Sequence, residues 1–326
     1  MENQAENTEN PLENENRAKL DEAELLKMKA YIDTLKDKIE EHPQIIKQIE
    51  KLESEKEEQL FYDTLKLIPY YELLELRFKV KDTNIDPKLY YFYKNNKNHV
   101  FIPKLSSRKW KNINFVDFIW LDILESLRKF SCPHETIKKL FDDLYNNELA
   151  DVFLNSIKDD LIEQLQTNDK KNEANTKKLD TIQKTLENKK LMRTFDEFIN
   201  HFFLFIKECL EGKDINIVIN EKQEISYDHR GEPKDALLIL PISKYIVSFV
   251  KDETKEWFWK SLGLFTDKEL DLLNLFKEHE DAYITLNQTE NQLKTLNELK
   301  EILVLKKYDS IKVAFKNNDQ VYHFYK

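Results

Sequence analysis

The segment Asp86-Pro87-Lys88-Leu89-Tyr90-Tyr91-Phe92-Tyr93-Lys94 decides how the middle of this chain is interpreted. Proline fits the first position of a helix, where its missing N–H is not needed, and an aspartate before it can cap the helix. The segment therefore predicts a helix that begins at Pro87. Its four consecutive aromatic residues, Tyr90 to Tyr93, favour packing in a core.

This helix lies in a basic segment of an acidic chain. Between Arg77 and Asn112 there are ten Lys or Arg residues against two acids, Asp82 and Asp86, a local charge of about +8 in a protein whose formal net charge is -10. Clustered positive charge attracts polyanions, because lysines and arginines that neutralise phosphates release counterions. The alternative is a solvated lysine-rich face, and charge alone does not decide between the two.

Glycine is scarce, with Gly212, Gly231 and Gly263 as the three glycines in 326 residues. Tight turns and phosphate-binding loops need residues that accept positive φ, whereas helices need few of them. We therefore expect a mainly α-helical protein of two or three domains. Cys132 and Cys209 lie far apart without a CxxC pair, the N-terminus is polar, and no apolar run approaches the ~18 residues of a membrane span, so we expect a cytoplasmic location.

No sequence motif indicates catalysis or a cofactor. The glycines are too far apart for a phosphate-binding loop, and neither HExxH nor GxSxG occurs. Asp142–Asp143 and Asp159–Asp160 are weak candidates for Mg²⁺, because neighbouring side chains on a helix point about 100° apart. We therefore expect no enzymatic activity, no cofactor and no metal, with a nuclease that uses dispersed carboxylates kept as a third hypothesis.

Composition and periodicity divide the chain into five segments. Residues 1–19 are acidic and polar and are expected to be disordered. Residues 20–60 are expected to form a coiled-coil-like helical arm, interrupted at Pro43. A compact domain over 65–150, a long helical region over 151–210 that pairs two subunits, and a small α+β domain over 212–326 complete the prediction.

Local signals place individual elements in these segments. A first helix is expected over Tyr70–Val80, and two more helices are expected on either side of the break at Ser131–Pro133. Thr266 and Glu269 have the spacing of a capping box, which predicts a helix over Asp267–Glu278. Near the C-terminus, 310–315 and 320–325 predict a β-hairpin.

Residues 70–140 resemble the winged-helix domain of MerR-type transcriptional regulators. The segment from Asp86 to Lys94 is similar to that family's Ser-Pro-x-Thr-Leu-Arg-Tyr-Tyr-Glu, and Arg108-Lys109-Trp110 resembles the Arg-x-aromatic that closes its wing. The following positions match the spacing of the next helices without gaps: Asp117, Leu121, Leu124, Leu127, Phe130 and Ile137.

The chain departs from the family's pattern at several positions. Tyr91 stands where the family has a phosphate-contacting arginine, and Ser131 stands where it usually has glycine. About three extra residues separate Trp110 from Asp117. The resemblance covers about 70 of 326 residues.

The resemblance implies a DNA-binding transcriptional regulator that binds duplex DNA as a homodimer. A winged helix places one helix in the major groove and a β-wing beside the backbone. The residues implied on the recognition helix are Lys88, Tyr91, Lys94 and Lys97. Those implied on the wing are Lys104, Arg108, Lys109 and Lys111. The rival hypothesis is a non-enzymatic coiled-coil scaffold or protein-interaction protein, whose N-terminal arm contacts a partner. No residue identifies an effector or partner for 212–326.

Overall fold

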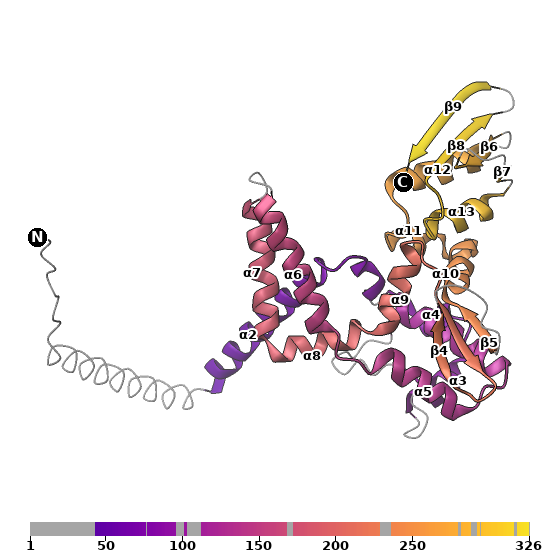
Figure 1. Cartoon of the computed structure of the whole chain (residues 1–326). Coiled ribbons are helices and arrows are strands. Elements are labelled where there is room, and N and C mark those ends of the chain that lie inside the picture. Colours follow the sequence, from indigo (N-terminus) through magenta and orange to yellow (C-terminus); the bar gives the residue numbers. More distant parts are fainter. Residues whose placement is uncertain are drawn as a thin grey trace, which may run out of the picture. The chain divides into compact units, whose positions relative to one another are not determined.

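The computed structural model describes residues 43–75, 77–95, 101–102, 112–167, 172–228, 236–279, 282–287, 292–293, 295–315 and 318–325 (Figure 1). The chain divides into two compact units, Met1–Tyr62 and Asp63–Lys326. The described residues are mainly helical, with small antiparallel sheets, so the expected fold class is confirmed at that level.

The N-terminal predictions fall largely outside the described residues. The tail 1–19 and the apolar seam between residues 25 and 39 lie outside them. Helix α2 (Pro43–Leu65) begins at the proline that was predicted to interrupt the arm. Proline is well tolerated there, because the first N–H groups of a helix have no partner inside it.

The predicted DNA-binding domain contains short elements followed by two longer helices. They are η1 (Tyr71–Leu74), β1 (Phe78–Lys79), η2 (Val80–Asp82), α3 (Pro87–Asn95), β2 (Asn112–Ile113), α4 (Phe115–Lys129) and α5 (His134–Tyr145). The helix expected over Tyr70–Val80 is wrong, since a 3-10 turn and a strand occupy that segment. The strand lets Phe78 pair with Ile113 and enter a cluster with Phe115, Phe118 and Phe258.

Helix α4 is the centre of the hydrophobic core. The side chain of Asn114 caps it by accepting the N–H of Asp117 at 2.7 Å. Its residues from Phe115 to Leu121 are all buried, so the first two turns are covered on every side. Other elements must enclose these turns, and α9 and α10 help to do so.

The region 151–210, predicted to be a long helical region, consists of four helices in its described residues. It forms α6 (Ala150–Thr167), α7 (Asn172–Glu187), α8 (Lys189–Phe198) and α9 (His201–Leu210). Helices α6 and α7 lie side by side (Figure 1), and Leu154, Leu161 and Ile182 are buried. The apolar face that was expected to pair two subunits is therefore covered within one chain.

The C-terminal part is α+β, as expected. The first group of elements is β3 (Asn216–Asn220), β4 (Ile225–Asp228), β5 (Ala236–Pro241), α10 (Ile242–Lys251), η4 (Glu253–Lys255), α11 (Glu256–Ser261) and α12 (Asp267–Glu278). The second group is β6 (Ala282–Leu286), β7 (Gln292–Leu293), α13 (Leu296–Val304), β8 (Ser310–Phe315) and β9 (Asn318–Tyr325). The sheets have the strand orders β4-β3-β5 and β7-β6-β8-β9. The hairpin β8–β9 and the helix at Thr266 confirm the local predictions.

Segments that were predicted as separate domains share one core. The ring of Phe249 in α10 lies 5.7 Å from Phe78, 4.9 Å from Phe115 and 5.1 Å from Phe118, measured between centroids. The Nζ atom of Lys255 lies over the Phe118 ring, 5.0 Å from its centroid. The aromatic cluster therefore joins α4 to the C-terminal part. Local sequence patterns do not predict this contact.

Candidate nucleic-acid interface on helix α3

Helix α3 begins as the sequence predicted. Pro87 is its first residue, and Asp86 caps it, because the Asp86 carboxylate accepts the N–H of Lys88 at 2.7 Å. The carbonyl of Asp86 accepts the N–H of Tyr90 at 2.9 Å. The aspartate side chain satisfies a backbone donor that the helix itself cannot satisfy.

The four aromatic residues of α3 divide between two faces. Tyr90 and Tyr93 are buried, as expected of core residues, whereas Tyr91 and Phe92 are 49% and 48% exposed. The expectation of a packed core is therefore right for one face and wrong for the other. A helix of nine residues resting on a core must turn half of a continuous aromatic run outward.

The outward face carries Lys88, Tyr91, Phe92 and Asn95, which we call the α3 stripe. All four are exposed, and their positions i, i+3, i+4 and i+7 place them along one side of the helix. A cation, two aromatic rings and an amide thus share a single solvent-facing surface. Of these four, sequence reasoning missed Phe92 and Asn95, although the helical spacing from Lys88 would have found them.

The inward face holds α3 firmly on the core. The Tyr93 ring lies 5.0 Å from Phe101 and 6.2 Å from His134, between centroids. Trp120 donates from Nε1 to the Phe101 carbonyl at 2.6 Å, which ties this segment to α4. Rigid support of this kind lowers the entropy that a surface helix loses when it binds a partner.

A buried acid lies near α3. Burial raises the pKa of Asp117 to about 7, and the hydroxyl of Tyr145 and the backbone N–H of Asn114 oppose this by hydrogen bonding to it. Burial, followed by the charge of Asp117, raises the pKa of Tyr90 to about 12. Tyr90 therefore stays neutral under ordinary conditions, and the inner face of α3 carries no phenolate.

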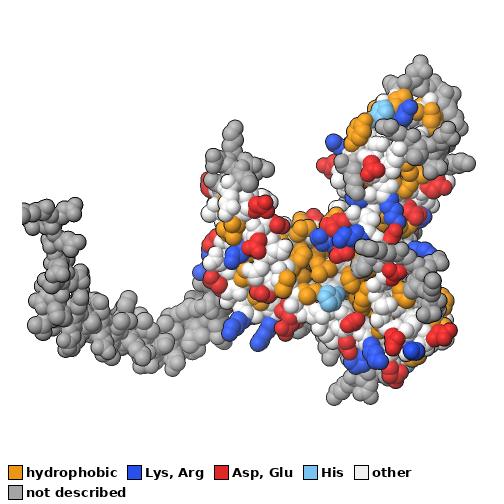
Figure 2. All heavy atoms as spheres, in the orientation of Figure 1, with side chains coloured by type: hydrophobic (Ala, Val, Ile, Leu, Met, Phe, Trp, Pro, Cys, Tyr) orange, Lys and Arg blue, Asp and Glu red, His pale blue; other side chains and the backbone are white. Residues whose placement is uncertain are grey.

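Lysines around α3 lack acidic partners among the described residues. Lys79, Lys81, Lys88 and Lys94 are exposed and pair with no carboxylate there, while Lys94 lies 5.7 Å from the Tyr90 ring centroid. Elsewhere lysines often pair four residues away, as in Lys138–Asp142, Lys177–Glu173 and Lys184–Asp180. Figure 2 shows positive and negative side chains interspersed over the face it presents. Around α3, these four lysines accompany the acidic residues Asp82 and Asp86, whose carboxylates accept backbone N–H groups.

Arg77 does not add to this charge. Its Nε donates to Glu75 at 2.6 Å, and its Nη1 donates to the carbonyl of Ser261 at 2.6 Å. The guanidinium is therefore engaged in holding its own segment to α11. One of the ten cations counted in the basic segment is thus a structural group.

The four predicted wing residues Lys104, Arg108, Lys109 and Lys111 lie outside the described residues, as does Lys97 of the predicted recognition helix. Their positions relative to Lys88, Tyr91 and Lys94 are therefore not assigned. The ends of the segment are described, because β1 pairs antiparallel with β2 through Phe78–Ile113 and Lys79–Asn112.

The candidate acidic pair Asp142–Asp143 has a structural explanation. Asp142 pairs with Lys138, and Asp143 accepts the Tyr227 hydroxyl at 2.9 Å. Within the described ranges, no three His, Cys, Asp or Glu side chains come together as a metal site. None of the helices there is long and apolar enough to cross a bilayer.

Comparisons with protein-family models, with curated proteins and with solved structures find no match to this chain.

Proposed function

We propose that this protein binds duplex DNA through helix α3 and acts as a transcriptional regulator. The observation that carries the proposal is the α3 stripe. It combines a lysine for phosphate contact, an amide for hydrogen bonding to base edges and two exposed rings, on a helix that is anchored from behind. Lysine and asparagine are among the side chains with which a helix in the major groove contacts DNA.

The order of elements around α3 supports a winged-helix arrangement. In such a module the basic wing follows the recognition helix and returns to a strand beside it. Here β2 directly follows the segment 96–111 and pairs with β1, which precedes α3. The pairing of β1 with β2 therefore joins the two ends of the segment that contains α3 and most of the basic residues.

A second feature agrees with the MerR resemblance. Ser131 adopts φ 56° at the end of α4, and the N–H of Cys132 bonds to the carbonyl of Leu127 at 2.9 Å. That left-handed position after a helix is the one that glycine usually fills. The serine therefore keeps the backbone geometry that the family's glycine would provide.

Each residue has a distinct role in the proposal. Lys88, in the first turn, would contact a phosphate, and Lys94 would contact another. Asn95 would hydrogen bond to a base edge, since asparagine pairs well with adenine in the major groove. Tyr91 replaces the family's arginine, and its hydroxyl can still donate to a phosphate oxygen. Lys97, Lys104, Arg108, Lys109 and Lys111 would extend the phosphate contacts.

A homodimer is part of the proposal, because two copies would present two α3 helices to the half-sites of a two-fold symmetric operator. Helices α6 and α7 bury apolar side chains within one chain. A second copy would therefore need a surface other than the face that they share.

A protein-interaction role is the second candidate. The observation that favours it is the exposure of Trp257 at 79% and of Phe130 at 65%. Large exposed aromatic side chains are frequent anchors of protein interfaces. Binding to DNA separates the two functions, because the interaction role needs no affinity for phosphates.

The test is fluorescence anisotropy with a labelled duplex of about 30 base pairs, read as log K against log salt from about 50 mM. The full-length chain is compared with a triple variant, Lys88→Ala, Arg108→Ala and Lys109→Ala. Because each lost phosphate contact lowers the slope by about 0.9, the triple variant should lower it by about 3.

The matched control is the triple variant Lys138→Ala, Lys177→Ala and Lys184→Ala, which removes three paired lysines from other helices. It should keep the wild-type slope. Absence of binding by the wild type at about 50 mM salt would reject the proposal and favour the interaction role.

A further inference from the structure

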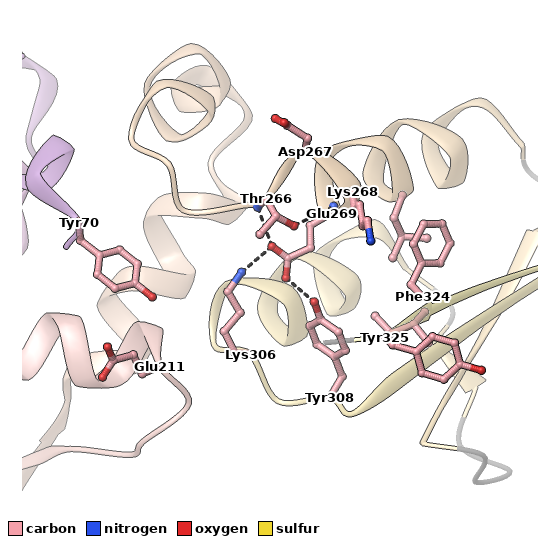
Figure 3. A pocket seen from close by; sticks show the side chains of 12 residues that line it. Tyr70, Glu211, Thr266, Asp267, Lys268, Glu269, Lys306, Tyr308, Phe324 and Tyr325 are labelled. Atoms are coloured by element: carbon pink, nitrogen blue, oxygen red, sulfur yellow. Dashed lines mark hydrogen bonds and ion pairs between the residues drawn. The ribbon is translucent and has the colours of Figure 1, made fainter. Parts of the chain in front are cut away.

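A cavity of about 760 Å³ lies away from α3, where four distant parts of the sequence meet (Figure 3). Its walls come from Tyr70, Glu211 at the end of α9, the start of α12 and the last residues of β9. This volume falls in the range of pockets that hold small organic molecules. The proposed DNA contact does not use it.

The floor of the cavity is a fixed polar cluster. Glu269 is buried, and its carboxylate accepts the Tyr308 hydroxyl at 2.6 Å and the backbone N–H of Thr266 at 2.7 Å. Lys306 pairs with the same carboxylate. Since Lys306 balances the charge of Glu269, this cluster forms a rigid floor and does not present an unpaired carboxylate to the cavity.

Two lining residues have left-handed backbones. Tyr70 has φ 61° and Lys306 has φ 50°. Lys306 follows the C-cap of α13, and the N–H of Lys307 bonds to the carbonyl of Ile302 at 3.0 Å, an arrangement in which glycine is usual. Strained side-chain-bearing residues cluster at functional sites, and both side chains here point to the same cavity.

Two acidic residues act on the hydroxyl of Tyr70. Burial raises the pKa of Tyr70, and the charges of Glu211 and Glu269 raise it further. Figure 3 shows Tyr70 beside Glu211 on one wall, while Lys268 lies on the far side with Phe324. Glu211 also pairs with Lys207 at 2.7 Å, but exposed pairs of this kind are weak and can exchange for a ligand.

Part of the lining is apolar or aromatic, next to the charged side chains of Asp267 and Lys268. Leu272 and Ile311 are buried beside the floor, and Phe324 is half-buried on the wall opposite Tyr70. One wall therefore offers a carboxylate with a phenol ring, which suits a cation, and the other offers apolar surface beside Lys268.

We propose that this cavity binds a small organic cation, an ammonium or guanidinium group on an apolar body. The cation lies between Glu211 and Tyr70, and the apolar body lies against Leu272, Ile311 and Phe324. The proposal does not depend on DNA binding by α3, so either one can fail alone.

The test is isothermal titration calorimetry of the full-length chain with phenethylamine, with agmatine and with 3-phenylpropionate, which has a similar body and the opposite charge. We expect saturable binding of at least one of the two amines and at least a tenfold preference for it over the carboxylate. Glu211→Gln should lower the affinity for that amine at least tenfold, and Tyr70→Ala should lower the affinity as well.

Glu208→Gln is the control, because Glu208 precedes Glu211 on α9 and pairs with Lys213 instead of lining the cavity. It should bind the amine like the wild type. Glu211 is exposed, so its glutamine variant is expected to fold, which circular dichroism checks. Equal binding of amine and carboxylate, an unchanged affinity in Glu211→Gln, or no saturation by either amine up to ~10 mM would overturn the proposal.

Discussion

The hydroxyl of Tyr145 donates a hydrogen bond to the buried carboxyl group of Asp117, 3.3 Å away. Asp117 lies in the first turn of α4, where Asn114 caps the helix, and its charge also acts on Tyr90 of α3. One titratable group thus connects α3, α4 and α5. Its protonation has consequences for stability that can be measured.

Asp117 should make the protein less stable as the pH rises from about 4 to about 7. The pKa in the folded protein is raised from 3.8 to about 7, so the folded state holds a proton that the unfolded state releases in this window. The stabilisation is fully present below the unfolded pKa and is lost as the pH passes the folded one. A shift of this size corresponds to about 4 kcal/mol as an upper bound.

Urea unfolding of the wild type and of Asp117→Asn between pH 5 and pH 8 checks this. Asparagine can still accept the Tyr145 hydrogen bond but cannot ionise. The variant should therefore gain stability relative to the wild type as the pH rises. Parallel stability curves for the two proteins would show that Asp117 does not titrate in this range.

Tyr93 should tolerate the loss of its hydroxyl but not of its ring. Its side chain is fully buried, and its hydroxyl has no hydrogen-bond partner among the residues that the structure describes. Removing an unsatisfied buried polar atom leaves no partner behind, so Tyr93→Phe should not lower the free energy of unfolding.

Tyr93→Ala should lower the free energy of unfolding by about 3–5 kcal/mol, because it opens a cavity between α3 and Phe101. Chemical denaturation of the pair of variants measures both effects. A large loss of stability in Tyr93→Phe would reveal a hydrogen bond to the hydroxyl.

Lys306→Met should cost about 3 kcal/mol, because it leaves the buried Glu269 carboxylate without its cation. Adding Glu269→Gln should recover part of that loss, since an amide needs no counter-charge. The double-mutant cycle, measured by urea unfolding, isolates the pair. Additive effects of the two changes would indicate that the ion pair contributes nothing.

Truncation of the two tryptophans of α11 should affect the free energy of unfolding to very different extents. Trp259 is 2% exposed and packs against Phe265 at 5.2 Å between centroids, whereas Trp257 is 79% exposed. Trp259→Ala should lower the free energy of unfolding by about 3–5 kcal/mol, and Trp257→Ala should change it by less than about 0.5 kcal/mol. Thermal unfolding of the two variants compares them directly. A marked loss in Trp257→Ala would mean that its ring is covered in solution.

Local chemistry made several elements predictable. Pro87 after Asp86 located the start of α3, and the Thr266–Glu269 spacing located α12, because a cap satisfies backbone groups within a few residues. The hairpin β8–β9 followed from two short alternating segments around a polar turn. Such signals do not depend on the rest of the chain.

The failures have a common physical cause. The segment Tyr70–Val80 was expected to be helical, but Phe78 enters an aromatic cluster whose other members are 37 or more residues away. The long helical region predicted over 151–210 forms four helices where the structure describes it, and pairing of α6 with α7 within one chain buries apolar side chains. In both segments, burial of apolar side chains against distant parts of the chain determined the structure, and the local sequence pattern did not.

Local sequence was enough to predict a mainly helical chain and the start of several helices, since glycine content, caps and periodicity act over short distances. It was not enough to predict which half of the aromatic run in α3 faces solvent, or that Tyr70, Glu211 and Glu269 lie around one cavity. Those outcomes depend on contacts between distant segments. Burial of apolar surface fixes them, and no short stretch of sequence encodes it.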